Sequence, residues 1–222
     1  MIHPVQNARP SVSAVAGVML MLAAGSVQAG TMSSSPTPPV VTSNDIANYA
    51  GIVDQDKWFG PNVRKGQTFT TGSTPLLLKA VSYFMVNQGA EPTKTYSVVV
   101  GTFSGGRFTQ LHSETFTQDF SWNRGEYMTW AFSKPPVLAT NTSSGVEVEM
   151  LTSTSPWQSG IPYICITENS YDGGQIYGFA AHERASEQES RTMRSTNDRV
   201  FHLDLQDSSA TGPEPVVQVP PG

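Results

Sequence analysis

The sequence predicts an all-β protein, an antiparallel two-sheet β-sandwich that we expect to be a jelly roll. The first observation is the stretch Gly145–Met150, in which apolar residues alternate with Glu147 and Glu149. Successive side chains of a strand point to opposite faces of a sheet, so this pattern indicates a strand with one apolar face. The second is the composition, with 19 Gly, 16 Pro and only 14% charged residues. The third is the succession of strand-like runs at short intervals, which is typical of sandwiches and barrels.

The expected strands follow one another between turn residues, nine or ten in all. We place them at residues 66–71, 76–86, 95–103, 107–116, 126–132, 145–150, 161–167, 175–181 and 198–205. The run at 76–86 is apolar on both faces near its end, which indicates a central strand. Ser104–Gly106 joins two of the runs, and glycine supplies the positive φ that tight hairpins need. We therefore expect a hairpin at 95–116.

Two of these runs indicate directly which side chains face the core. Met128, Trp130 and Phe132 share one face of the run at 126–132. In the last run, the inward residues are Phe201, Leu203 and Leu205, and the outward residues are Val200, His202 and Asp204. Two such apolar faces are expected to pack against each other across the sandwich.

The first 29 residues have the pattern of a signal peptide. Arg9 supplies a positive charge, Val12–Ala24 is apolar, and Val27–Ala29 offers small residues for cleavage after Ala29. The alternative is a retained membrane anchor, although the apolar run is short for a bilayer span. We expect a flexible Ser/Thr/Pro linker over 30–48, the sandwich over 49–207 and a disordered tail over 208–222. The protein is then secreted, extracellular or periplasmic, with no stable membrane anchor after cleavage.

Charge and cysteine content exclude some classes of protein. The formal net charge is −5, so the basic surface expected of a nucleic-acid-binding protein is absent. Cys165 is the one cysteine, which rules out an intrachain disulfide. No basic residue adjoins it to lower its pKa, so we expect a buried apolar side chain and not a nucleophile.

Several segments carry a resemblance to a known group of proteins. They are Gly66–Thr71, Tyr96–Thr109, Trp130–Pro136, Tyr177–Ala180 and Asp198–Leu205. Together they resemble the carbohydrate-binding-module-like β-sandwich ectodomains of exported bacterial proteins, which often carry PEP-CTERM-type sorting tails. The resemblance implies a jelly-roll fold and export. Pro213–Pro215 matches the Pro-Glu-Pro motif of such tails, but no apolar helix or basic cluster follows it, which implies secretion without a tail anchor.

Aromatic residues in predicted turns are the candidates for ligand binding. A sugar ring presents C–H faces that stack on an exposed aromatic ring, and polar neighbours fix its orientation. The alternative is that each ring folds back to cap an end of the sandwich. The predicted ligand-binding residues are Trp58, Trp122, Asn123, Arg124, Trp157, Tyr171 and Asp172.

No catalytic or metal site is predicted. Glu147 and Glu149 share a face at a spacing near that of glycosidase carboxylates, but the alternation indicates that this face is solvated. The histidines are scattered without zinc-ligand spacing. The oxygen-rich segments Asp54–Asp56 and Asn169–Asp172 leave a structural calcium ion as an alternative.

The sequence thus predicts a secreted, non-catalytic module that binds glycan or another extracellular polymer through loop aromatics, with no cofactor. A self-associating structural protein of the cell envelope or matrix, without a small ligand, is the first alternative. A hydrolase or lyase acting on glycans is the second.

Overall fold

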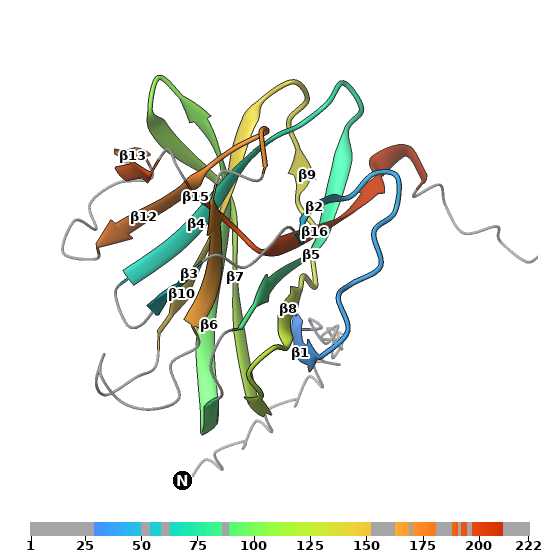
Figure 1. The fold of residues 1–222 in the computed structure, drawn as a ribbon. Coiled ribbons are helices and arrows are strands. Elements are labelled where there is room, and N and C mark those ends of the chain that lie inside the picture. The colour runs from blue at the N-terminus through green and yellow to red at the C-terminus, as the bar shows by residue number, and fades with distance from the viewer. Residues whose placement is uncertain are drawn as a thin grey trace, which may run out of the picture.

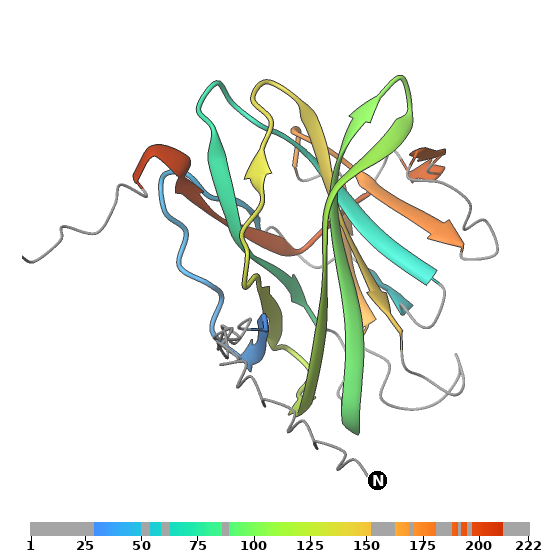
Figure 2. The ribbon, with the colours of Figure 1, turned by 180° about the vertical axis from the view of Figure 1, so that it is seen from behind.

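The structure is a computed structural model of the 222-residue chain, and it describes residues 29–49, 54–58, 63–85, 89–151, 163–168, 171–180, 188–190, 192–194 and 197–210. These residues form antiparallel strands and one 3₁₀ turn, η2 (Ser208–Ala210). Two large sheets face each other, as Figures 1 and 2 show from opposite sides. The predicted all-β, two-sheet architecture is confirmed, and the jelly-roll connectivity stays a prediction.

One large sheet has six strands. Its order is β1 (Thr31–Ser35), β8 (Tyr127–Ala131), β5 (Leu76–Phe84), β16 (Phe201–Asp207) and β2 (Ile46–Asn48), with β9 (Val137–Leu138) also paired to β5. The predicted central strand is β5, which lies between β8 and β16.

The second large sheet has seven strands. Its order is β13 (Gln188–Ser190), β7 (Arg107–Trp122), β6 (Gly89–Ser104), β10 (Ser143–Met150), β4 (Val63–Thr70), β12 (Ile176–Ala180) and β14 (Thr192–Arg194). The long hairpin β6–β7 contains the predicted hairpin, with Gly105 and Gly106 at φ 57° and 77° in its turn. A small sheet of β15 (Asn197–Arg199), β11 (Tyr163–Glu168) and β3 (Asp54–Trp58) contacts both large sheets, β11 touching β5 and β15 touching β12.

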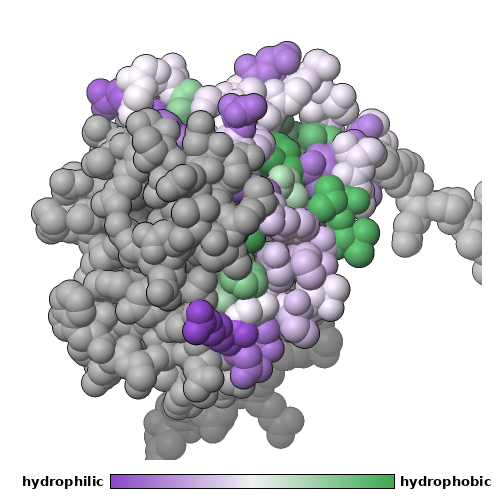
Figure 3. All heavy atoms as spheres, in the orientation of Figure 1, coloured by the Kyte–Doolittle hydropathy of each residue, from purple (hydrophilic) through white to green (hydrophobic). Residues whose placement is uncertain are grey.

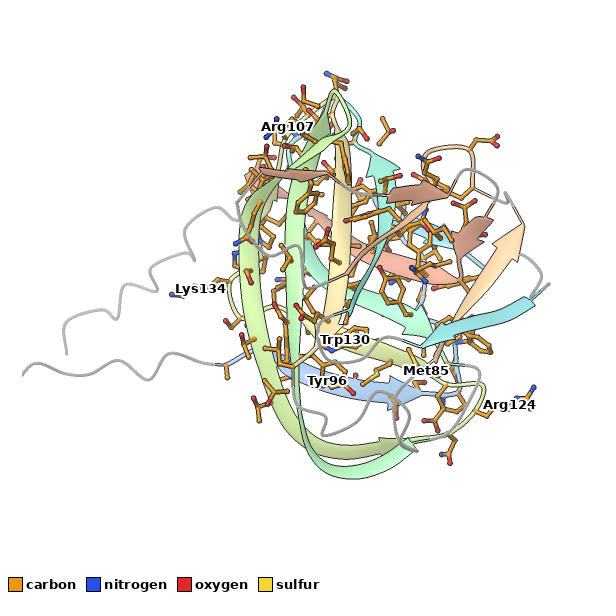
Figure 4. All side chains as sticks on the ribbon, turned by 90° about the vertical axis from the view of Figure 1, so that its left-hand side faces the viewer. Met85, Tyr96, Arg107, Arg124, Trp130 and Lys134 are labelled. Carbon is orange, nitrogen blue, oxygen red and sulfur yellow. The ribbon has the colours of Figure 1, made fainter. Side chains whose placement is uncertain are left out.

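The apolar core lies between the two large sheets. Trp130 of β8 is fully buried, with its ring 6.1 Å from that of Tyr83 and 5.6 Å from that of Tyr96. In Figure 4, Trp130 and Tyr96 lie side by side inside the sandwich. The inward residues predicted for β8 and β16 are all buried, as are Val146 and Val148 of β10. The alternation in these strands therefore identified their core-facing sides correctly.

The segment 30–48 is not the linker that the sequence predicted. Residues 31–35 pair with β8 and residues 46–48 pair with β16, so both ends of the segment are edge strands. Met32 and Asn48 are buried at 4% exposure. The polar composition was misleading because both ends of the segment pair through their backbones with β8 and β16, and backbone pairing does not require apolar side chains.

A second correction concerns the outward face of β16. Val200 and His202 were expected to be solvated, but both are buried, whereas Asp204 is partly exposed. The reason lies in the residues on both sides of β2, since Asp45 before it and Tyr49 after it both contact His202. Tyr49 stacks on His202 at 6.4 Å, and its hydroxyl donates to the Pro39 carbonyl oxygen at 2.8 Å.

Candidate functional site

The turn after β7 presents two of the predicted binding residues, Asn123 and Arg124. Asn123 donates through its backbone N to Glu126 Oε2 at 2.7 Å and through Nδ2 to Glu126 Oε1 at 2.8 Å. These bonds from Asn123 hold the pKa of Glu126 below its ordinary value. Gly125, at φ 88°, donates to the Met85 carbonyl oxygen at 2.9 Å and so ties the turn to the end of β5. Asn123 and Arg124 are both exposed, so the fixed turn presents the Arg124 side chain and the Asn123 amide, whose Nδ2 is bonded to Glu126, to the solvent.

The tryptophans predicted to lie in turns are placed differently. Trp122 is the last residue of β7 and pairs with Gly89, and Trp58 is the last residue of β3 and pairs with Tyr163. Both therefore belong to strand ends and not to the loops themselves. Trp157 lies outside the described residues. The backbone of Trp122 directly precedes the fixed turn, so residues 122–124 are consecutive members of the predicted site.

The Tyr171 ring packs against the protein and is not left free to stack on a ligand. Its ring contacts that of Phe201 edge-on at 5.4 Å, and the side chain packs against the core. Burial raises the pKa of its hydroxyl, and its backbone N donates to Asp198 Oδ2 at 2.9 Å. Tyr171 therefore fits the alternative considered for these rings, that of capping the sandwich. Its neighbour Asp172 is exposed.

The structure does not bring the two predicted turns together. Thr70, at the end of β4, donates through Oγ1 to the Gly173 carbonyl oxygen at 3.0 Å, which places Asp172 where β4 ends and β5 begins. The turn at Arg124 is bonded to Met85, beyond the other end of β5. The described residues therefore do not form a single groove lined by both turns.

Glu147 and Glu149 are buried, at 0% and 1% exposure, although the sequence predicted a solvated face. Their strand β10 lies in the middle of the seven-stranded sheet. Glu147 pairs with Gly66, and a Cβ at Gly66 would overlap the ring of Tyr177. The Tyr177 ring of β12 thus lies over this face, and alternation alone cannot reveal such cover from another strand.

A buried polar network links the seven-stranded sheet to the small sheet. Gln67 donates through Nε2 to Asp198 Oδ1 at 2.9 Å and accepts at Oε1 from the Arg199 backbone N at 2.9 Å. Arg199 donates through Nε to the Gly66 carbonyl oxygen at 3.0 Å, and its guanidinium lies 5.7 Å from the Tyr83 ring centroid. No sequence pattern indicates this network, because its members are far apart in the chain. Its hydrogen bonds hold β15 onto β4, which is a structural task.

The second buried polar cluster joins Asp45 to β16. Asp45 Oδ2 lies 3.2 Å from His202 Nε2 and accepts from Thr42 N at 2.7 Å, while Oδ1 accepts from Leu205 N at 2.8 Å. Burial opposes the ionisation of Asp45, but these hydrogen bonds outweigh it and hold its pKa below the ordinary value of 3.8. The cluster fastens the segment before β2 onto the sheet.

Among the residues whose exposure the structure describes, few large apolar side chains are open to a partner. They are Val40, Val41, Leu111, Val137 and Leu151. On the described part of the face in Figure 3, apolar residues appear as separate areas among polar ones. Among the residues that the structure describes, no three or more His, Cys, Asp or Glu side chains gather as a metal site would require. No helix formed by these described residues has the length and hydropathy of a membrane span.

Comparisons with known proteins give no family for this chain. No protein-family model matches it, and a search of curated proteins returns no significant match.

Proposed function

We propose that this protein is a secreted, non-catalytic β-sandwich module that binds glycan or another extracellular polymer through the turn at Trp122–Arg124. The observation that carries the proposal is the fixed geometry of this turn. Glu126 accepts two hydrogen bonds from Asn123, and Gly125 is tied to β5, while Asn123 and Arg124 remain exposed. Side chains on a fixed backbone lose less entropy on binding, which favours affinity for a flexible polymer.

The residues of this turn suit the surface of a polysaccharide. The Arg124 guanidinium offers five N–H donors, and the Asn123 amide oxygen remains available to accept hydrogen bonds. These groups match the hydroxyl and carboxylate oxygens of sugars. Trp122 directly precedes them in the chain, and aromatic residues supply the apolar contact that such polar groups orient.

The burial of Glu147 and Glu149 supports the proposal that the module is not catalytic. A carboxylate that acts on a glycosidic bond must reach the substrate from a cleft. Both side chains are at most 1% exposed in the middle of the seven-stranded sheet. Their burial favours a structural role.

Retention on polysaccharides tests the proposal. The protein beginning at Gly30 is mixed with insoluble polysaccharides and, in gel-shift assays, with soluble ones, neutral and acidic. A lost hydrogen bond to a charged group costs about 1.5–3 kcal/mol, so Arg124→Ala is expected to weaken binding roughly tenfold or more. Trp122→Ala is expected to weaken it as well, with circular dichroism checking that the variant folds.

The matched control is Arg107→Ala. Arg107 is also exposed, at the first residue of β7 next to a turn, and it projects from the opposite end of the molecule to Arg124 in Figure 4. If the Arg107 and Arg124 variants bind equally to every polymer retained by the wild type, the turn at Arg124 is not the binding site. If the wild type retains none, the binding function is wrong.

A self-associating envelope or matrix protein is the second candidate, and the edge of β7 favours it. Among the described strands, β13 covers this edge only at Arg107–Thr109. A long open edge can pair with another chain. Association that rises with protein concentration in light scattering, without retention on any polymer, is the outcome expected of this candidate.

A further inference from the structure

Gly30 occupies a site that only glycine fits. It directly precedes β1, whose first residue, Thr31, pairs with Ala131. A Cβ at Gly30 would overlap Phe116 Cε1 and Glu114 Oε1, and it would lie 2.8 Å from the Ala131 carbonyl oxygen. The Gly30 backbone is therefore packed closely against β7 and β8, although the preceding residue, Ala29, is exposed.

The carboxylate beside Gly30 is that of Glu114, and hydrogen bonds favour its charged form. The Ser133 backbone N donates to Glu114 Oε1 at 3.0 Å and to Oε2 at 3.2 Å, and His112 Nε2 lies 3.6 Å from Oε2. Burial opposes ionisation of Glu114, whose side chain is 12% exposed, but these bonds outweigh it and hold its pKa below the ordinary value. At neutral pH, Gly30 therefore lies against a negative charge.

We propose that the Glu114 carboxylate binds the new N-terminus that forms when the bond between Ala29 and Gly30 is cut. A signal peptidase would hydrolyse this bond with one water, which leaves a carboxylate on Ala29 and an amine on Gly30 that takes up a proton. The resulting α-ammonium of Gly30 pairs with Glu114 Oε1 and donates to the Ala131 carbonyl oxygen. Removal of the leader thereby completes the domain at the start of β1.

The geometry supports this pairing because the amine nitrogen and a Cβ are each one bond from Cα. Atoms that would crowd a Cβ are therefore within roughly 5 Å of the nitrogen, and a free terminus can rotate to close that distance. An α-ammonium has three donors, whereas the amide in the uncut chain has one. A terminal ammonium next to a partly buried carboxylate is thus better satisfied than the amide that it replaces.

The charged groups around the freed amine determine its expected titration. Glu114 and His112 face it from β7, and Lys134 follows Ser133 in the connection after β8. Glu114 is the nearest charge to Gly30 and is negative, so it favours the ammonium form. The α-amine pKa is then expected to lie above its ordinary value of about 7.7–8.0. A raised pKa contributes stability that is present below the ordinary value and is lost as the pH rises through the raised one.

The test begins with the exported protein, whose N-terminus is identified by intact mass. Gly30 is the expected first residue, and a different first residue overturns the proposal. The α-amine is then titrated by NMR in protein beginning at Gly30, as the wild type, Glu114→Gln and Glu126→Gln. Glu126 is the matched control because its carboxylate also accepts a backbone hydrogen bond, in the turn tied to Met85. A raised pKa in the wild type and the Glu126 variant, lost in the Glu114 variant, supports the pairing, and equal values in all three overturn it.

A second comparison does not depend on the folding of the Glu114 variant. Protein beginning at Gly30 is compared with protein that retains Gln28 and Ala29, in which position 30 has no free amine. The processed form is expected to unfold at a higher urea concentration at pH 7, and the difference is expected to shrink above the raised amine pKa. Equal midpoints at pH 7 would overturn the proposal.

Discussion

The loss of the Asp45 carboxylate is the sharpest test of how the N-terminal segment is held. In Asp45→Ala, the buried Leu205 N loses its acceptor at 2.8 Å, and His202 loses a partner at 3.2 Å. Leaving one buried donor unpaired costs about 1–3 kcal/mol, and a hydrogen bond to a charged carboxylate contributes about 1.5–3 kcal/mol. Because the two losses share one side chain, we expect a total of about 3 kcal/mol.

Urea unfolding followed by tryptophan fluorescence measures this cost. With a slope of about 1–3 kcal/mol per molar urea, the midpoint is expected to fall by roughly 1–3 M at pH 7. The matched control is Glu126→Ala, which removes a carboxylate bonded to Asn123 at the surface and is expected to cost under about 1 kcal/mol. Equal midpoints for the two variants at pH 7 would refute the idea that the Asp45 cluster fastens this segment.

The pH dependence gives this prediction a second readout. The folded-state pKa of Asp45 lies below its ordinary value of 3.8, so its contribution is fully present above that value and is lost as the pH falls through the lowered pKa. The difference between wild type and Asp45→Ala should therefore shrink only in acid, below about pH 4. A difference that already disappears between pH 7 and pH 5 would show that the charge of Asp45 is not what stabilises the cluster.

Two further predictions concern the core and the outer face of β16. Trp130→Ala removes a fully buried indole that contacts the rings of Tyr83 and Tyr96. It is expected to lower the free energy of unfolding by about 3–5 kcal/mol, measured in urea. A loss below about 1 kcal/mol would contradict the role of Trp130 in the core. Asp204→Asn is expected to stabilise the protein at pH 7, because burial and the charge of Asp45 raise the pKa of Asp204. The gain should fade as the pH drops toward the ordinary value of 3.8, and Asp207→Asn, at an exposed carboxylate whose pKa Ser209 lowers, should show no such gain.

The candidate site was predictable only in part. Asn123 and Arg124 follow from turn composition, and they are exposed as expected. Tyr171 belongs to a turn by the same criterion, but its ring packs against Phe201, some thirty residues later in the chain. A turn residue is placed by local composition, whereas the direction of its ring depends on which distant side chain leaves room for it.

The sequence by itself determined that this chain forms antiparallel sheets and which side of several strands faces the core. Alternation along Met128–Phe132 and Phe201–Leu205 is enough for that, because neighbouring strand residues must point to opposite faces. Only the tertiary structure decided what covers the other faces. Glu147 and His202 have the pattern of solvated residues, yet both are buried, since Tyr177 lies over the face of Glu147 and Tyr49 stacks on His202. Strand periodicity is a local property, whereas cover comes from segments that only folding brings into contact.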